Sequence, residues 1–349
     1  MKAIDIAGRV IGPGQPCFIV AEAGVNHNGD LEVGKRLIEV AACAGADAVK
    51  FQSFNAEHVV SASAPKAEYQ LRLTDPGESQ LGMLRRLELS PDAQRELRMH
   101  CEKVGVLFLS TPFDEESADL LDRMGVRAFK VGSGELTNWP YLESMGRRGK
   151  PVILSTGMSY LSEVDEAVRV LRHAGCEHLI LLHCVSEYPA EPAEANLRAI
   201  RTLEVAFQVP VGFSDHTQGI EVALAAVALG ACVIEKHFTL DHGLPGPDHR
   251  ASLDPEELRR MIGAIRTVER ALGDGVKRPA KSELRNREVV RRSLSVVTDI
   301  PEGAVLQPDM LEALRPATGI SPTLLRLVVG RKARRSLRAG QLLAWGDLD

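Results

Sequence analysis

Eight short apolar runs, most of them rich in β-branched residues, constrain the fold of this chain more than any other feature. Their residue ranges are 17–24, 47–54, 105–113, 127–136, 151–157, 178–185, 210–217 and 231–238. Longer amphipathic stretches lie between them, and several, such as residues 31–45, end in a glycine suited to a left-handed C-terminal cap. Alternation of this kind predicts a parallel sheet with crossover helices. Eight consecutive units predict a (β/α)₈ barrel, also called a TIM barrel.

The pattern changes after the last run. Residues 254–273 have the apolar spacing of a further helix, which would complete the eighth unit. A polar stretch containing proline and lysine follows, and from about residue 290 short β-runs alternate with turns. We therefore expect a barrel domain over residues 1–280, a linker over 281–289 and a small β-rich domain over 290–349.

Charge and cysteine content narrow the classes of protein to which the chain can belong. The 349 residues carry a formal net charge of -5, so we expect no basic surface for nucleic acid. The first residues lack the charged and apolar regions of a signal peptide, and no apolar run is long enough to span a bilayer. We therefore expect a cytoplasmic protein without nucleic-acid or membrane partners. The six cysteines form no CxxC pair, which argues against a zinc ribbon or a disulfide scaffold.

Polar side chains stand at or just after the end of nearly every predicted strand. The active sites of (β/α)₈ barrels form at this end of the strands, where the βα loops begin. The residues concerned are Glu22, Lys50, Gln52, Thr111, Lys130, Ser133, Glu135, Ser155, Ser186, Tyr188, Ser214, His216 and His237. A simpler interpretation, in which the residue only begins a loop, is open for each of them taken alone. Their convergence on one mouth of a barrel favours an active site.

Two histidines, His216 and His237, follow consecutive strands, so we expect their imidazoles to lie close enough to share one divalent ion. With so few protein ligands, the ion would be exchangeable Mn²⁺ or Mg²⁺. Two hydrogen-bonded histidines without a metal are the alternative. Lys50 and Lys130, with the hydroxyls at the same mouth, supply cations and donors suited to a phosphate and a carboxylate. Asp248 follows the last strand, close to the expected metal position.

A series of motifs along the chain carries a family resemblance. The motifs are FIVAEAGVNHNGD, AVKFQSF, FLSTPFD, FKVGSGELTNWP, ILSTGM, LLHCVSEYPA, GFSDHTQG, EKHFTLD and GPDHRASLDPEEL. In this order they resemble the sialic acid synthase family, whose members condense phosphoenolpyruvate with an N-acetylated amino sugar, and the resemblance covers almost the whole chain. The region after residue 290 resembles the small antifreeze-like (SAF, β-clip) domain of that family. The stretch LRPATGISP matches the segment in which members place a substrate-binding arginine, here Arg315.

The resemblance implies a role for each matching residue. His216 and His237 would hold the metal. Glu22 would contact the metal-bound region or the sugar hydroxyls, and Glu135 would act as an acid or base. Phosphoenolpyruvate would be bound by Lys50, Gln52, Thr111, Lys130, Ser133, Ser155 and Ser214, with Ser186 at a position where some members carry asparagine. Tyr188 and Asp248 would position the sugar, and Arg315 would reach its N-acetyl group from the partner subunit of a domain-swapped homodimer.

Alternatives are open at this point for the identity of the sugar and for the class of function. The first expectation is N-acetylmannosamine, which gives N-acetylneuraminate, and the alternative is 2,4-diacetamido-2,4,6-trideoxymannose, which gives legionaminate. A metal-dependent isomerase or hydrolase on the same barrel would need the two histidines but no cations for an enolpyruvate. A non-catalytic carbohydrate-binding protein would bind sugar without turnover.

Overall fold

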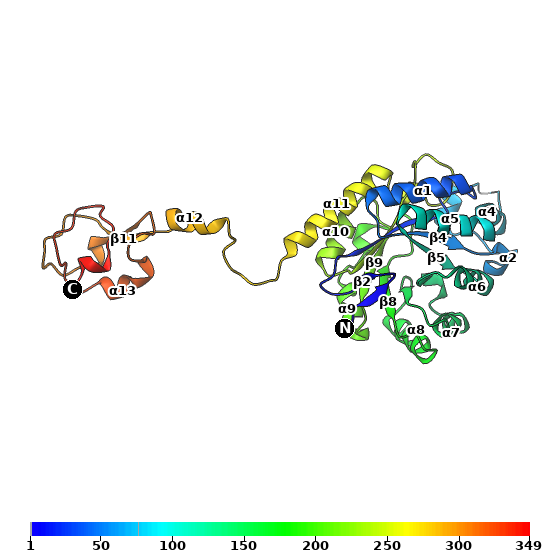
Figure 1. The fold of residues 1–349 in the computed structure, drawn as a ribbon, viewed down its shortest axis with the longest axis horizontal. Helices are drawn as coiled ribbons and strands as arrows, with labels where there is room; N and C mark the ends of the chain where they lie inside the picture. The colour runs from blue at the N-terminus through cyan, green and yellow to red at the C-terminus, as the bar shows by residue number, and fades with distance from the viewer. Residues whose placement is uncertain (1, 76) are drawn as a thin grey trace. The chain divides into compact units, whose positions relative to one another are not determined.

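The computed structural model describes residues 2–75 and 77–349, which divide into two compact units (Figure 1). The first unit ends at Gly273 and the second begins at Asp274. The larger unit contains an eight-stranded parallel sheet, in which the strands are ordered β5-β4-β3-β10-β9-β8-β7-β6. The end strands β5 and β6 also contact each other, so the sheet is nearly closed. The predicted (β/α)₈ barrel is confirmed.

The barrel strands coincide with the eight apolar runs of the sequence. They are β3 (Phe18–Gly24), β4 (Ala48–Ser53), β5 (Leu107–Pro112), β6 (Phe129–Val131), β7 (Val152–Ser155), β8 (Leu179–Cys184), β9 (Val211–Asp215) and β10 (Val233–His237). Most of their residues are buried on both faces of the sheet, as expected of parallel strands covered by helices.

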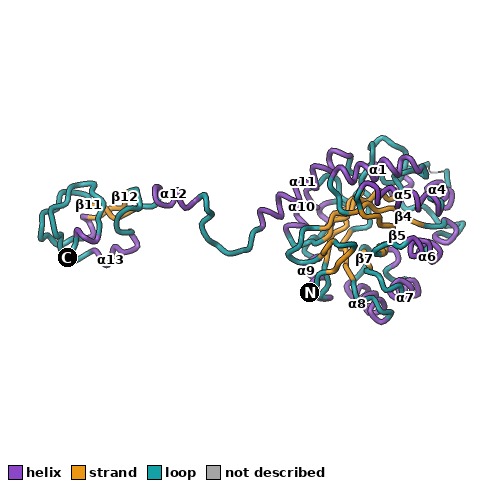
Figure 2. Tube along the Cα trace, in the orientation of Figure 1, coloured by secondary structure: helices purple, strands orange, loops and turns teal. Residues whose placement is uncertain are grey.

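Helices surround the barrel on its outside (Figure 2). They are α1 (Leu31–Ala44), α2 (Ala56–Val59), α3 (Glu68–Leu73), α4 (Gln80–Leu87), α5 (Pro91–Val104), α6 (Glu115–Met124), α7 (Trp139–Arg147), α8 (Leu161–His173), α9 (Ala199–Phe207), α10 (Glu221–Ala228) and α11 (Pro255–Leu272), with short 3₁₀ turns at Ser133–Glu135, Pro192–Glu194 and His249–Ala251. Local sequence fixes the ends of α1. The Asp30 side chain accepts hydrogen bonds from the first-turn backbone, and Gly45, at φ 88°, ends the helix as predicted.

The connection from β4 to β5 contains three short helices, α2, α3 and α4, before the longer helix α5. Asn55 and Ser79 cap α2 and α4 through their side chains, a local signal that marks helix starts. This insertion contributes α2 and α4 to the wall of the cavity described below.

A two-stranded hairpin precedes the barrel and covers the amino-terminal end of its strands. It consists of β1 (Ile4–Ile6) and β2 (Arg9–Ile11), which pair antiparallel. Ile4, Ile6 and Ile11 are buried in one cluster with interior barrel residues such as Phe18 and Val20. This end of the barrel is therefore packed with apolar side chains.

Asp47 joins three parts of the barrel unit. Its Oδ1 accepts a hydrogen bond from Arg9 of β2 at 2.9 Å, and its Oδ2 accepts from the Ile19 backbone of β3 at 2.9 Å and from Arg266 of α11 at 3.1 Å. The Asp47 side chain is only 11% exposed. Loss of this carboxylate would leave the buried Ile19 N–H without a partner, and the Arg266 guanidinium would keep only its contacts with Glu269 and the Cys17 carbonyl.

We expect Asp47→Ala to lower the free energy of unfolding by about 2–4 kcal/mol, because the cost of leaving the Ile19 N–H unpaired adds to the loss of the contacts with Arg9 and Arg266. Urea unfolding followed by circular dichroism measures this change. The control is Asp165→Ala, which removes a carboxylate from an exposed pair with Arg169 on α8 and should cost about 0.5 kcal/mol at most. Equal stability of the two variants would contradict the structural role that we assign to Asp47.

The second unit is a small, β-containing domain with its own core. It contains α12 (Glu283–Val290), β11 (Ser293–Val296), β12 (Leu311–Leu314) and α13 (Leu325–Val328), with 3₁₀ turns at Pro308–Met310, Pro322–Leu324 and Trp345–Asp347. Strands β11 and β12 pair antiparallel, and Leu294, Leu306 and Leu343 belong to a separate apolar cluster. Helix α12 lies where the sequence led us to expect a linker.

Two further findings concern the described residues of both units. None of their helices combines the length and the apolar character needed to cross a bilayer. All six cysteines are free thiols, and five of them are buried.

Candidate active site

A cavity of about 400 Å³ opens at the carboxyl ends of the barrel strands. It brings together most of the residues that the sequence singled out, namely Glu22, Lys50, Gln52, Thr111, Lys130, Ser133, Ser155, Ser186, Tyr188, Ser214, His216, His237 and Asp248. Two predicted residues are not among its lining. Glu135 ends the 3₁₀ turn after β6, and its carboxylate accepts a hydrogen bond from Asn138 at 2.7 Å. Arg315 belongs to the second unit, directly after β12.

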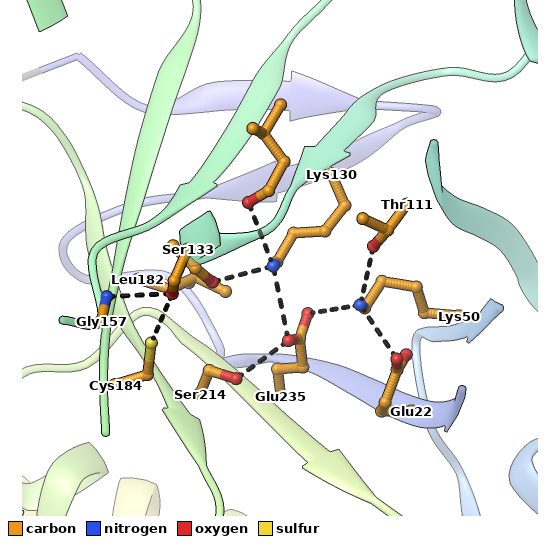
Figure 3. A network of polar contacts seen from close by, with 12 residues as sticks. Glu22, Lys50, Thr111, Lys130, Ser133, Gly157, Leu182, Cys184, Ser214 and Glu235 are labelled. Carbon is orange, nitrogen blue, oxygen red and sulfur yellow. Dashed lines mark hydrogen bonds and ion pairs between the residues drawn. The ribbon is translucent and has the colours of Figure 1, made fainter. Parts of the chain in front are cut away.

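Two lysines and two glutamates form the charged centre of the cavity (Figure 3). The Lys50 ammonium lies 3.1 Å from Glu22 Oε1 and 3.5 Å from Glu235 Oε2. The Lys130 ammonium lies 3.6 Å from Glu235 Oε1, so Glu235 bridges the two lysines. All four residues are at least 96% buried. Each charged group in this desolvated site has an opposite partner, which offsets part of the cost of burying it.

Hydroxyl groups complete the hydrogen bonding of this centre (Figure 3). Lys50 donates to Thr111 Oγ1 at 3.0 Å, and Lys130 donates to Ser155 Oγ at 2.8 Å. Ser214 donates to Glu235 Oε1 at 2.9 Å. Fixed cations surrounded by hydroxyls form a site suited to a small anion that carries phosphate and carboxylate groups.

Sequence reasoning did not select Glu235, although a signal was present. Side chains two residues apart along a strand point to the same face. Glu235 lies two residues before His237 on β10. If the His237 side chain points into the barrel mouth, the Glu235 side chain must point inward as well. Lys236, between them, points to the opposite face.

The two glutamates have opposite pKa shifts. For Glu235, burial alone would raise the pKa, but Lys130 and Lys50 outweigh it and lower the pKa to about 2. For Glu22, burial raises the pKa to about 7, with a further contribution from Glu235, and Lys50 only partly opposes this. Glu22 Oε2 is buried and has no hydrogen-bond partner within the described part of the chain. One carboxylate is therefore permanently charged, and the other can exchange a proton near neutral pH.

Three side chains converge on the backbone of Gly157, directly after β7. The Gly157 amide donates to Ser133 Oγ at 2.9 Å, and Ser133 Oγ lies 3.2 Å from Cys184 Sγ. A Cβ atom at position 157 would clash with Ser186 Oγ and would come within 2.9 Å of Ser133 Oγ. Only glycine leaves room for these hydroxyls beside the backbone amide.

The two predicted histidines lie side by side in the cavity, with ring centroids 5.6 Å apart. His216 Nδ1 donates to the Val185 carbonyl, so the lone pair of His216 is on Nε2, 3.2 Å from Ser214 Oγ. His237 Nδ1 is buried without a hydrogen-bond partner among the described residues and lies 3.7 Å from Asp248 Oδ2. Burial lowers the pKa of His216 to about 4 and that of His237 well below its ordinary value. Both rings are therefore neutral, the form that binds metal ions.

An ion pair behind the cavity fixes the two histidines relative to each other. Asp215 and Lys236 are register partners on β9 and β10, and their side chains form a 2.8 Å salt bridge that is fully buried. Asp215 Oδ1 also accepts hydrogen bonds from the backbone N–H and the hydroxyl of Thr217, the residue that follows His216 in the sequence. The strands are thereby held together at the residues that precede His216 and His237.

A second histidine and carboxylate group lies outside the cavity lining. His242, Asp254 and Glu257 have ligand atoms close enough to hold an ion, and His242 Nε2 lies 3.4 Å from Glu257 Oε2. The two carboxylates also cap the start of α11, since each accepts a backbone N–H of the other residue. Helix capping accounts for this cluster, which was not predicted from the sequence.

Comparison with known proteins agrees with the fold. Residues 37–277 match the NeuB family and residues 291–349 match the SAF domain. The N,N'-diacetyllegionaminic acid synthase of Campylobacter jejuni is 50% identical over 93% of this chain and 98% of its own, and that of Legionella pneumophila is 46% identical over 97% and 96%. The crystal structure of N-acetylneuraminic acid (sialic acid) synthetase from Leptospira borgpetersenii, in complex with citrate, has a TM-score of 0.72 at 37% identity and covers 82% of this chain and 95% of that one. The chain therefore belongs to the NeuB family, and its second unit is a SAF domain.

Proposed function

We propose that this protein condenses phosphoenolpyruvate with 2,4-diacetamido-2,4,6-trideoxymannose, giving N,N'-diacetyllegionaminic acid and phosphate. The observation that carries the proposal is one cavity that holds both a buried pair of lysines among hydroxyls and a pair of neutral histidines. The two relatives at 46% and 50% identity are named N,N'-diacetyllegionaminic acid synthases, which favours the diacetamido sugar over N-acetylmannosamine, the first expectation from sequence. N-acetylmannosamine remains the second candidate.

Lys130, with Ser133 and Ser155, would hold phosphoenolpyruvate on the hydroxyl-rich side of the cavity. Lys50, which is paired with Glu22 and Glu235, would supply a second cation at the same centre. Such preorganised cations stabilise developing charge without rearranging during the reaction.

The two histidines fit a divalent ion. Both imidazoles are neutral, and His237 Nδ1 is a buried nitrogen without a partner in the described part of the chain. His216 and His237 would hold Mn²⁺ or Mg²⁺, which when bound supplies Lewis-acid polarisation of the sugar aldehyde. Asp248 lies beside His237, where it would orient the sugar or the ion.

Glu22 is our candidate for proton transfer, because Glu135 does not line the cavity. As the enol carbon of phosphoenolpyruvate bonds to the aldehyde carbon, protonated Glu22 would donate its proton to the aldehyde oxygen. Water then adds to the cationic carbon that carries the phosphate ester, and its proton returns to Glu22. Cleavage of the carbon–oxygen bond to phosphate leaves the 2-keto acid, and phosphate takes the proton of the new hydroxyl. Glu235, ionised throughout, would stabilise the cationic carbon.

Assembly is a separate prediction. The domain-swapped homodimer, in which Arg315 of the partner subunit reaches the N-acetyl group, stays a prediction from the family resemblance.

Phosphate release by the purified protein tests the proposed function. We expect release in the presence of phosphoenolpyruvate, Mn²⁺ and the diacetamido sugar, and a product with nine carbons in its chain by mass spectrometry. EDTA should abolish the release, and added Mn²⁺ should restore it. Sugar turnover without phosphoenolpyruvate would instead indicate an isomerase or hydrolase. Binding of sugar without release, in a folded sample, would indicate a carbohydrate-binding protein.

A further inference from the structure

One side of the cavity is apolar, although the charged centre lies directly beneath it. The apolar side chains are Val25, Phe54, Val59, Met83, Leu84, Leu87 and Phe113, which we call the apolar wall. They form a cluster separate from the barrel core, with the four residues Val25, Phe54, Met83 and Leu87 more than 90% buried. Apart from the weakly accepting thioether of Met83, none of these side chains carries a hydrogen-bond donor or acceptor for a sugar hydroxyl.

The apolar wall comes from one side of the barrel. Val25, Phe54 and Phe113 directly follow β3, β4 and β5, which are neighbours in the sheet. The other wall residues come from α2 and α4, in the insertion between β4 and β5. The rim on this side is therefore built by loops and short helices above the strand ends.

The hydroxyl-rich part of the cavity lies on other strands. Ser133, Ser155 and Ser186 follow or end β6, β7 and β8. The two parts adjoin where β5 contacts β6, and the two histidines, on β9 and β10, separate them on the other side of the barrel. An anion held by Lys130 and the serines would occupy the hydroxyl-rich part, which leaves the apolar wall to the sugar.

We propose that the apolar wall selects the sugar by its methyl groups, accepting a 6-deoxy sugar with acetamido substituents and rejecting one with a hydroxyl group on carbon 6. The inference rests on the proposed function and adds the residues that set its specificity. Burial of a hydroxyl against side chains that cannot hydrogen-bond is unfavourable, whereas a methyl group gains contact area. The amide side chain of Gln80 also lines the cavity from this segment, and amides match acetamido groups in hydrogen bonding.

Rates with three sugars test the wall in the unaltered protein. The sugars are the 2,4-diacetamido-2,4,6-trideoxy sugar, N-acetylmannosamine and 6-deoxy-N-acetylmannosamine, each with phosphoenolpyruvate and Mn²⁺. Differences of single groups in apolar pockets change kcat/KM by about 10–200-fold. We expect 6-deoxy-N-acetylmannosamine to exceed N-acetylmannosamine by about 10-fold and the diacetamido sugar to exceed both.

Two variants test the residues themselves. Val59→Thr keeps the side-chain shape and adds a hydroxyl, and Leu84→Gln adds an amide; both positions are half-buried and line the cavity. We expect each variant to reduce the preference for the 6-deoxy sugar over N-acetylmannosamine by about 5-fold or more, with an unchanged KM for phosphoenolpyruvate. The matched control is Val205→Thr on α9, which is 55% exposed and outside the cavity lining, and which should retain the preference.

The outcomes separate this inference from the proposed function. Equal kcat/KM for N-acetylmannosamine and its 6-deoxy form in the unaltered protein would overturn the role of the wall while leaving the condensation intact. Preferences that stay the same in both folded variants would also overturn it. Absence of phosphate release with all three sugars would overturn the proposed function itself. If a variant does not fold by circular dichroism, the comparison of sugars in the unaltered protein still decides.

Discussion

Replacing His237 with alanine is expected to lower kcat/KM for phosphate release by about three orders of magnitude, which corresponds to roughly 4 kcal/mol of transition-state stabilisation. His237 offers a neutral imidazole whose Nδ1 has no hydrogen-bond partner among the described residues. The neighbouring His216 cannot replace it, because His216 Nδ1 is already bound to the Val185 carbonyl. A single remaining imidazole would hold a divalent ion weakly.

Mn²⁺ binding, followed by electron paramagnetic resonance, distinguishes a lost ligand from a general loss of activity. We expect His237→Ala to weaken Mn²⁺ binding by at least about 100-fold, and His216→Ala to behave similarly. His173→Ala, an exposed histidine on α8, should change neither the binding nor the rate. If His237→Ala bound Mn²⁺ as tightly as the unaltered protein, the metal assignment would be wrong.

The strand ends show how much of the fold and of the site could be predicted from the sequence. The eight apolar runs predicted all eight barrel strands because a parallel strand buried on both faces leaves a continuous apolar signature. The positions of His216 and His237 followed from the same reasoning, since residues at the ends of adjacent parallel strands meet at one mouth. For this reason thirteen predicted residues line one cavity.

Features that depend on side-chain direction or on distant partners were not predictable in this way. Glu135 lies only four residues after β6, but it is the last residue of a 3₁₀ turn. The turn sets the direction of the Glu135 side chain, and strand periodicity does not predict that direction. The hairpin β1–β2 was missed because each of its strands has only three residues. The apolar wall combines residues from three loops and two short helices, so its members share no periodic pattern in the sequence.

Glu235 changes how the charged centre is understood. Two lysines alone, buried in one cavity, would repel each other and tend to lose a proton. With Glu235 between them, Lys50 has a raised pKa even though burial acts to lower it, because Glu22 and Glu235 outweigh the burial. Lys130 differs, since burial lowers its pKa and Glu235 only partly compensates. An incoming anion would therefore stabilise the charged form of Lys130 more than that of Lys50.

Replacing Lys130 with methionine is accordingly expected to raise the KM for phosphoenolpyruvate by about 100-fold or more, at roughly 3 kcal/mol for a lost charge-assisted contact in a buried site. Methionine preserves much of the apolar stem, so the change removes mainly the ammonium group, which donates to Ser155 and faces Glu235. Mn²⁺ binding should stay unchanged, because Lys130 belongs to β6 and the histidines to β9 and β10.

Steady-state kinetics with varied phosphoenolpyruvate, at saturating sugar and Mn²⁺, measures this effect. Lys150→Met is the matched control, since Lys150 pairs with Asp122 and does not line the cavity, and its KM should match that of the unaltered protein. Loss of a buried charge partner can also destabilise the barrel, because Glu235 would keep only Lys50. Ser155→Ala therefore serves as a milder second variant, expected to raise the KM by about 10-fold. An unchanged KM in folded Lys130→Met would show that phosphoenolpyruvate binds elsewhere in the cavity.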